Sequence, residues 1–238
     1  MTRSSRLLQG FDVVIDLLFP PRCVSCRASS SFFCTDCREK IRRIEPPFCP
    51  KCGYPAFNAH SSRCRECEAN PLKHLHAIRS VAIFEDGPLK TAIHKFKYQN
   101  HQAVSRPLAS LLANCYTTNQ LNTEVIVPVP LHKSRYRERG YNQSMLLAQE
   151  LSKLINQPVN QKTLVRHRAT RSQMTLKAAE RQQNVANAFA CGANTLADKT
   201  VLLIDDVCTT GATLDACAQA LKQANVRAVY GLTLARAL

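Results

Sequence analysis

One stretch decides the fold of this chain: Val201-Leu202-Leu203-Ile204-Asp205-Asp206-Val207-Cys208-Thr209-Thr210-Gly211-Ala212-Thr213. Its first four residues are apolar β-formers, which predict a short buried strand that ends at the two aspartates. Gly211 permits a tight turn, and Thr213 can cap a helix that begins there. The following apolar residues recur at helical spacing, and they are Leu214, Cys217, Ala218 and Leu221. The stretch therefore predicts a strand, a loop and a helix in succession.

The same stretch has the chemistry to hold a sugar phosphate. The N–H groups at a helix N-terminus, next to a hydroxyl-rich loop, form a phosphate site. The carboxylates of Asp205 and Asp206 can accept hydrogen bonds from two vicinal sugar hydroxyls. The alternative is a capped turn whose acids serve only solubility, but such a turn needs neither adjacent aspartates nor three threonines around one glycine. We therefore expect a sugar with a phosphate at one end.

Length and composition set the class of protein. The 238 residues, 45% of them hydrophobic, allow one medium domain with an ordinary core and a small appendage. No apolar run approaches the roughly 20 residues of a membrane span, and no secretory signal is recognisable, so we expect a cytoplasmic protein. The net charge of +15, from 32 Lys and Arg against 17 Asp and Glu, favours a polyanionic partner. Charge alone does not choose among nucleic acid, an anionic membrane surface and a phosphorylated small molecule.

Eight of the twelve cysteines form four Cys-x-x-Cys pairs near the N-terminus. In a cytosolic chain such clustering predicts metal binding rather than disulfides. Two pairs complete a tetrahedral Zn²⁺ site with no open position, so the zinc is expected to be structural. Eight thiolates fit two zinc ions, and both a sequential and an interleaved pairing satisfy the spacing. The predicted ligands are Cys23, Cys26, Cys34, Cys37, Cys49, Cys52, Cys64 and Cys67.

The chain divides by pattern into three parts. Residues 1–21 predict an amphipathic helix that packs on the protein itself or docks a partner. Residues 22–72 form the zinc module, and residues 75–238 alternate strands with helices. Expected strands cover 80–85, 124–129, 198–205 and 227–235, and expected helices cover 88–98, 106–116, 141–155 and 213–224. This alternation predicts an α/β fold with a parallel sheet covered on both faces, whose ligands bind beyond the carboxyl ends of the strands.

The opening stretch resembles the phosphoribosyl pyrophosphate (PRPP) motif of type I phosphoribosyltransferases, in which Asp-Asp and two spacers precede Thr-Thr-Gly-x-Thr. The resemblance implies a phosphoribosyltransferase-like sheet flanked by helices, PRPP as ligand and Mg²⁺ as its companion. Asp205 and Asp206 would be the catalytic acids. The implied PRPP-binding residues of this stretch are Asp205, Asp206, Val207, Cys208, Thr209, Thr210, Gly211, Ala212 and Thr213.

Two basic segments fit further anion contacts. Leu131, His132 and Lys133 follow an expected strand, at the place where the resembled enzymes hold pyrophosphate, although a solvated basic turn is the alternative. Residues 166–189 predict a basic lid that excludes water, or else a disordered surface loop. Within it, Arg171 and Lys177 are expected to contact the pyrophosphate.

Nucleic acid is a second expected ligand. Arg135, Arg137 and Arg139 are candidate contacts for the phosphates of single-stranded DNA. Single strands also stack their bases on aromatic rings. The candidate rings are Phe96, Tyr98, Tyr136 and Tyr141, unless they belong to the core.

The order of motifs resembles the ComF family of competence proteins, which includes the GntX-type proteins. The N-terminal Cys-x-x-Cys pairs precede Pro-Val-Pro-Leu-His at 128–132, Arg-Gly-Tyr-Asn-Gln at 139–143, a spaced pattern from Thr170 to Phe189, and the PRPP motif. The resemblance covers essentially the whole chain. It implies a role in natural transformation and DNA uptake, with incoming single-stranded DNA handled at the cytoplasmic side of the inner membrane. DNA-uptake or inner-membrane proteins would then be partners, since no membrane span is expected.

Three functions follow from these observations. The first is a transferase that moves the phosphoribosyl group to an unidentified acceptor, as in nucleobase or nucleotide metabolism. The second is a PRPP-sensing module without turnover. The third is a DNA-handling factor whose pocket is only structural, and the intact motif from Asp205 to Thr213 argues against it. The first two stay open, because no recognisable signature marks an acceptor pocket.

Overall fold

A computed structural model of the chain describes residues 20–29, 31–55, 64–168, 184–185, 187–192 and 195–238. The amphipathic helix expected near the N-terminus falls on residues 1–19, outside this range. Arg171 and Lys177 of the expected lid also lie outside it. Among the described residues, no helix is long and apolar enough to cross a membrane.

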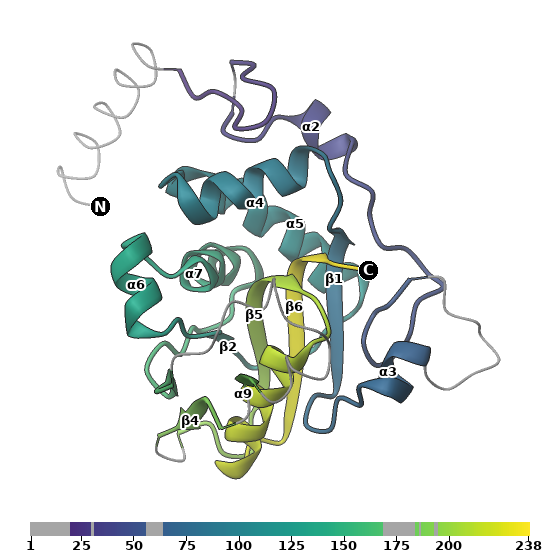
Figure 1. Ribbon diagram of the computed structural model, residues 1–238, viewed down its shortest axis with the longest axis vertical. Helices are drawn as coiled ribbons and strands as arrows, with labels where there is room; N and C mark the ends of the chain where they lie inside the picture. Colours follow the sequence, from purple (N-terminus) through teal and green to yellow (C-terminus); the bar gives the residue numbers. More distant parts are fainter. Residues whose placement is uncertain (1–19, 30, 56–63, 169–183, 186, 193–194) are drawn as a thin grey trace.

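A four-stranded parallel sheet forms the centre of the molecule (Figure 1). The strands, in spatial order, are β1 (Ala77–Ile83), β6 (Ala228–Arg236), β5 (Thr200–Cys208) and β2 (Val125–Pro128). All three pairings are parallel, as the alternation of strands and helices predicted. The ladder between β5 and β6 runs from Thr200 opposite Ala228 to Cys208 opposite Arg236. The motif strand β5 therefore lies in the interior of the sheet, with a neighbour on each side.

Helices cover both faces of the sheet. On one face lie α4 (Pro88–Tyr98), α5 (Ser105–Thr118) and α7 (Gln143–Ile155), and on the other lies α9 (Ala212–Gln223). Successive residues of β5 point to opposite faces, so Leu202 and Ile204 join the first core while Val201 and Leu203 join the second. The continuous apolar run of this strand thus reflects burial on both sides.

Two local expectations for the motif are wrong. The strand was expected to end at the aspartates, but β5 continues to Cys208, because β6 supplies pairing partners that far. The N-cap of α9 is Gly211 rather than Thr213. Gly211 has a φ of 84°, and an added Cβ would lie 2.9 Å from the Cδ1 atom of Ile78. Both the backbone angle and the close packing therefore require glycine.

A third difference concerns the basic segment that follows β2. The sequence left two interpretations of it open, a pyrophosphate loop and a solvated basic turn, but the segment forms a helix. Residues Lys133–Arg139 form α6, which begins where the His132 side chain accepts a hydrogen bond from the Ser134 amide. It ends at Gly140, which has a φ of 78°. The short helix displays the arginines of this region along one structured segment.

The ends of the expected lid pair with each other. Strands β3 (Leu164–Arg166) and β4 (Phe189–Cys191) form an antiparallel hairpin, with Arg166 opposite Phe189. The two ends of the predicted lid segment, at residues 166 and 189, are therefore held side by side. This hairpin was absent from the predicted strands because each of its strands has only three residues.

The N-terminal segment is more than an appendage. Its two short helices, α2 (Thr35–Glu39) and α3 (Arg65–Ala69), lie apart, and residues 42–51 between them run along the outer edge of β1 (Figure 1). Hydrogen bonds from the Ile44 amide to the Val81 carbonyl (3.0 Å) and from the Ile78 amide to the Lys51 carbonyl (2.8 Å) close that edge. The predicted domain boundaries at 22–72 and 75–238 stay predictions.

Candidate functional site

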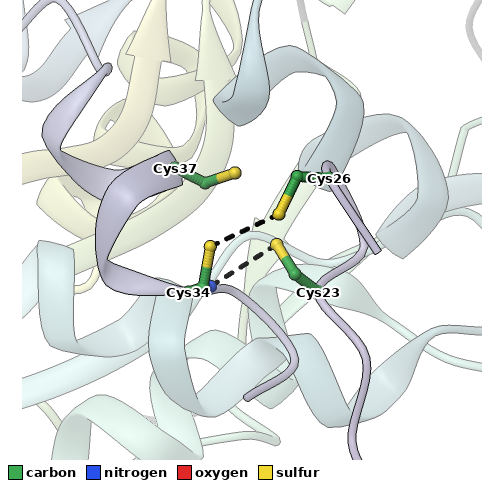
Figure 2. Close-up of side chains that lie close together, drawn as sticks. All are labelled: Cys23, Cys26, Cys34 and Cys37. Atoms are coloured by element: carbon green, nitrogen blue, oxygen red, sulfur yellow. Dashed lines mark hydrogen bonds between the residues drawn. The ribbon is translucent and has the colours of Figure 1, made fainter. Parts of the chain in front are cut away.

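The first cysteine cluster gathers the first two Cys-x-x-Cys pairs (Figure 2). Cys34 is the N-cap of α2, so Cys34 and Cys37 meet the turn that carries Cys23 and Cys26. The sulfur atoms of Cys26 and Cys34 are 3.5 Å apart, and the Cys34 amide donates to the Cys23 sulfur at 3.4 Å. All four sulfur atoms lie within 4.8 Å of one another.

The second cluster combines the other two pairs, and three of its four cysteines are buried. The Cys49 and Cys67 sulfurs are 3.9 Å apart, and those of Cys52 and Cys64 are 3.5 Å apart. A tetrahedral zinc with bonds of about 2.3 Å to sulfur requires sulfur–sulfur distances of about 3.8 Å. Both clusters fit this geometry, so the pairing is sequential and not interleaved.

The two clusters lie on opposite sides of the sheet. Cys23, Cys34 and Cys37 belong to the core beneath α4, α5 and α7, whereas Cys49 and Cys67 belong to the core beneath α9. Each zinc ribbon therefore completes one of the two hydrophobic cores.

The aspartate pair lies at the carboxyl end of β5, and each carboxylate has a fixed partner. Asp205 accepts hydrogen bonds at Oδ1 from the Ser144 hydroxyl at 3.0 Å and from the Asp206 amide at 2.9 Å. Asp206 Oδ1 forms an ion pair with the Lys97 ammonium at 2.8 Å, and the two side chains are 10% and 19% exposed. Lys97 is contributed by α4 and Ser144 by α7.

Burial and the neighbouring charge change the acidity of the pair. Burial first, and then the charge of Asp206, raise the pKa of Asp205 to about 7. The Lys97 charge and the hydrogen bonds from the Asp206 amide and Ser144 oppose that rise. Near neutral pH, Asp205 can therefore exchange its proton when a ligand arrives.

A cavity of about 640 Å³ opens in front of the acid pair, at the carboxyl ends of the strands. Besides Asp205 and Asp206, five residues of the predicted PRPP site line it, and they are Val207, Thr209, Thr213, Leu131 and His132. Arg135, one of the predicted DNA contacts, lines it as well. Arg139 also reaches the cavity. The cavity therefore joins the motif loop to the segment expected to hold pyrophosphate, which lie far apart in the sequence.

The remaining predicted residues lie elsewhere. Cys208 at the end of β5, Thr210 and Gly211 in the loop, and Ala212 at the start of α9 are buried and do not line the cavity. Lys133 and Arg137 lie outside the cavity lining and border a neighbouring hollow with Tyr136. Leu131 lines both the cavity and this hollow, so Lys133, the first residue of α6, lies next to the cavity without lining it.

The aromatic candidates split into two kinds. Phe96 and Tyr141 are buried and in contact, and the Tyr141 hydroxyl donates to the Phe96 carbonyl, so both belong to the core. Tyr98 and Tyr136 are 49% and 52% exposed. The guanidinium carbon of Arg139 lies 5.1 Å from the centroid of the Tyr98 ring. Arg139 and Tyr98 therefore form a pair of one basic and one aromatic side chain at the cavity rim.

Two side chains at the site were not identified from the sequence as partners of the acid pair. Lys97 carried only the signal of a basic residue at a helix end, which is common in solvated helices. Ser144 directly follows the Arg-Gly-Tyr-Asn-Gln run, so that run marked its neighbourhood. Neither signal indicates a distant aspartate as partner.

Known proteins match the chain in both parts. The family model described as double zinc ribbon domain matches residues 14–68, and the one described as phosphoribosyl transferase domain matches residues 96–237. Among solved structures, the glutamine PRPP amidotransferase of B. subtilis is 17% identical and covers 58% of this chain and 30% of that one, with a TM-score of 0.40.

Relatives match over nearly the full length. Competence protein F of Haemophilus influenzae is 34% identical over 91% of this chain and 97% of its own. DNA utilization protein YhgH of Escherichia coli K12 is 32% identical over 93% of this chain and 100% of its own, and competence protein ComFC of Bacillus subtilis is 30% identical over 85% and 83%. With this coverage, the chain belongs to the ComF family of competence and DNA utilization proteins, in which a double zinc ribbon precedes a phosphoribosyl transferase domain.

Proposed function

We propose that this protein binds PRPP in the cavity at the carboxyl end of its sheet and handles single-stranded DNA during DNA uptake. One observation carries the proposal: the acid pair of Asp205 and Asp206 faces a cavity of about 640 Å³ with basic side chains at its rim. The pair can hold two sugar hydroxyls, and the rim can hold anions. Membership of a family whose named relatives act in competence and DNA utilization supports the DNA role.

The parts of PRPP have distinct places in this proposal. The ribose hydroxyls donate to Asp205 and Asp206, and the 5′-phosphate lies at the segment from Thr209 to Thr213, which ends in the first turn of α9. The pyrophosphate lies toward Leu131 and His132, with Lys133, Arg171 and Lys177 as further contacts. Mg²⁺ bound together with PRPP would neutralise part of the charge of the pyrophosphate, a role suited to its preference for phosphate oxygens.

The reaction, where an acceptor is present, is displacement at the C1 carbon of the sugar. The bond from C1 to the pyrophosphate oxygen breaks, the acceptor bonds to C1, and the transition state resembles an oxocarbenium ion. The protein's task is to stabilise the leaving negative charge and exclude water. Without an acceptor, the same site serves a PRPP-sensing module, and turnover distinguishes the two.

DNA binding is assigned to the rim of the same cavity. Arg135 and Arg139 of α6 line the cavity, Arg137 of the same helix borders the neighbouring hollow, and the exposed ring of Tyr98 lies beneath Arg139. Phosphates of a single strand would contact the arginines, while a base stacks on the ring. We place this activity in the cytoplasm, with any attachment to the inner membrane made through a protein partner.

The test is calorimetry of the full-length protein with PRPP and Mg²⁺, followed by PRPP titration in the presence of a single-stranded oligonucleotide. We expect a saturable PRPP site and competition between the two ligands. Release of pyrophosphate with nucleobases or single strands would establish transfer, whereas binding without release would establish the sensing module. Absence of PRPP binding at millimolar concentration would refute the proposal.

A further inference from the structure

Arg236, the last residue of β6, is 1% exposed and is among the largest side chains that are fully buried. Within the described ranges, none of the ion pairs joins it to a carboxylate. A guanidinium stays charged in a protein, and burying it without a negative partner is costly. The position therefore requires an explanation from its surroundings.

The surroundings of Arg236 join the second zinc ribbon to the PRPP motif. Its Nη1 atom donates to the carbonyl of Cys52, a predicted zinc ligand, at 2.8 Å. The same nitrogen lies 3.4 Å from the sulfur of Cys208, which precedes the motif loop. The guanidinium also lies over the ring of Tyr54, with its central carbon 5.6 Å from the ring centroid. The buried side chain of Arg236 thus contacts both the second zinc ribbon and the end of β5 that leads into the motif loop.

Zinc chemistry supplies the missing negative charge. Four thiolates around one Zn²⁺ carry a net charge of about −2, and the second cluster lies in the same core as Cys208. Outer residues that hydrogen-bond to a metal site orient its ligands, and their loss typically lowers metal affinity by about 10–100-fold. Arg236 fits such a role toward the second ribbon.

The segment that follows the ribbon reinforces this contact. The Asp215 carboxylate, in the first turn of α9, accepts hydrogen bonds from the amides of His74 at 2.9 Å and Leu75 at 3.1 Å. Leu72 packs against Gly211, where an added Cβ would lie 3.0 Å from its Cδ2 atom. The start of α9, which the proposed phosphate site uses, is therefore held by the chain leaving the second ribbon.

The first ribbon makes a different attachment. Its Val24 carbonyl accepts a hydrogen bond from Lys95 of α4 at 2.6 Å, and its cysteines belong to the core on the other face of the sheet. The described residues of the first ribbon are therefore attached to α4 and its core, on the face of the sheet opposite to α9. The two zinc ions of one chain thus offer an internal comparison.

We propose that Arg236 is a positioning residue that couples zinc in the second ribbon to the shape of the loop between β5 and α9. Loss of that zinc releases the Cys52 carbonyl, shifts Arg236 and opens the loop. The regulatory consequence rests on the proposed function: PRPP affinity depends on the second zinc and, by reciprocity, PRPP protects that zinc. The first zinc has no such effect.

The first experiment compares Arg236→Met with Arg79→Met. Arg79 is a matched control, because it donates to the Pro50 carbonyl of the same ribbon at 2.9 Å while lying on β1, away from the loop. We expect the Arg236→Met variant to lose the zinc of the second ribbon to a chelator about 10–100-fold more readily than the wild-type protein does. We also expect its PRPP affinity to be lower. Arg79→Met should leave PRPP affinity unchanged. Equal losses of PRPP affinity in both variants would overturn the assignment, and partial rescue by Arg236→Lys supports it.

The second experiment uses the wild-type protein and needs no PRPP. A chelator removes zinc stepwise while iodoacetamide labels exposed thiols, which are located by peptide mass spectrometry. Cys208 is 3% exposed, and we expect it to become reactive when the second ribbon loses zinc. Cys217, which is 0% exposed within α9, should stay protected and reports unfolding. If Cys208 stays protected after the second zinc has left, or reacts only together with Cys217, the coupling is overturned.

The third experiment repeats zinc release with PRPP and Mg²⁺ present. Slower release of the zinc in the second ribbon supports the coupling. Labelling of the cysteines identifies which ribbon has lost its zinc. The coupling is overturned if PRPP slows the release of both zinc ions equally. It is also overturned if PRPP slows the release of neither while calorimetry shows that PRPP is bound. A wild-type protein that binds no PRPP refutes the proposed function, while the Cys208 labelling still decides the link between ribbon and loop.

Discussion

The two ends of the cavity hold their charges in different ways. At the acidic end, Asp205 and Asp206 are fixed by Ser144 and Lys97, and the ion pair is mostly shielded from water. At the basic end, α6 displays arginines on a short exposed helix, and Arg135 pairs with Glu138 of the same helix at 3.1 Å. Desolvated charges with fixed partners interact strongly, whereas solvated charges are screened and act weakly. The acidic end should therefore respond to single changes and the basic end only to several together.

The largest effect is expected from Asp205→Asn combined with Asp206→Asn. Each substitution removes a charge-assisted hydrogen bond to a sugar hydroxyl, worth roughly 1.5–3 kcal/mol. The sum corresponds to a loss of PRPP affinity of at least about 100-fold, measured by calorimetry. Asp198→Asn is the control, because Asp198 is exposed and its positive φ of 57° suits asparagine. Unchanged affinity in the double variant would place the sugar elsewhere.

The next effect is the pH dependence of PRPP binding. Asp205 accepts a charge-assisted hydrogen bond from a sugar hydroxyl only when it is ionised, and burial and Asp206 raise its pKa to about 7. We expect PRPP affinity to fall by up to about tenfold per unit as pH drops below 7. The effect of Asp205 on folding stability has the opposite sign. The folded protein holds the proton of Asp205 more tightly than the unfolded chain does, because the pKa is raised from 3.8 to about 7 on folding. The contribution of Asp205 to stability is therefore lost as pH rises from 3.8 to about 7.

That profile is read by calorimetry between pH 5.5 and pH 8.5, in buffers of matched ionic strength, with thermal unfolding measured alongside. Flat PRPP affinity across this range would show that Asp205 does not titrate in the binding step. The acidic end would then resemble the basic end in having no desolvated charge that controls the ligand.

A smaller effect is expected from Lys97→Met. The Lys97 charge lowers the pKa of Asp205, so its loss should move the midpoint of the PRPP pH profile to higher pH. PRPP affinity near pH 7 should fall, and part of it should return at pH 8.5. Lys153→Met is the control, because Lys153 also forms an ion pair, with Glu150, but lies outside the cavity lining. A uniform loss at every pH would assign Lys97 a structural role instead.

The smallest effect per residue is expected at the basic end. Arg135→Ala, Arg137→Ala and Arg139→Ala together should flatten the salt dependence of single-strand binding by up to about three phosphate contacts, or a slope change of about 2. The measurement is a salt titration with a labelled oligonucleotide. A triple alanine variant of Lys153, Lys162 and Lys199, which are exposed and outside the cavity lining, is the control for net charge. Equal slopes for both triple variants would remove α6 from the DNA site.

Much of the fold followed from local pattern. The helix expected at 88–98 is α4 with the same bounds, and the apolar run before Asp205 is a strand buried on both faces. Four Cys-x-x-Cys pairs indicated two zinc sites, and the motif residues indicated the cavity end of β5. Periodicity and short spacings carry these features, because each depends on neighbours within a few residues. The hairpin of β3 and β4 escaped prediction because strands of three residues give too short a pattern.

The sequence by itself determined the order of elements, the cysteine pairs and the aspartate motif. Only the tertiary structure decided which partners these residues have. Ser144 meets Asp205 across 61 residues, Lys97 meets Asp206 from another helix, and Arg236 meets Cys52 across 184 residues. The reason is physical: a pattern within a strand or helix fixes which face is buried, but the packing of whole elements decides which charged groups share a desolvated site.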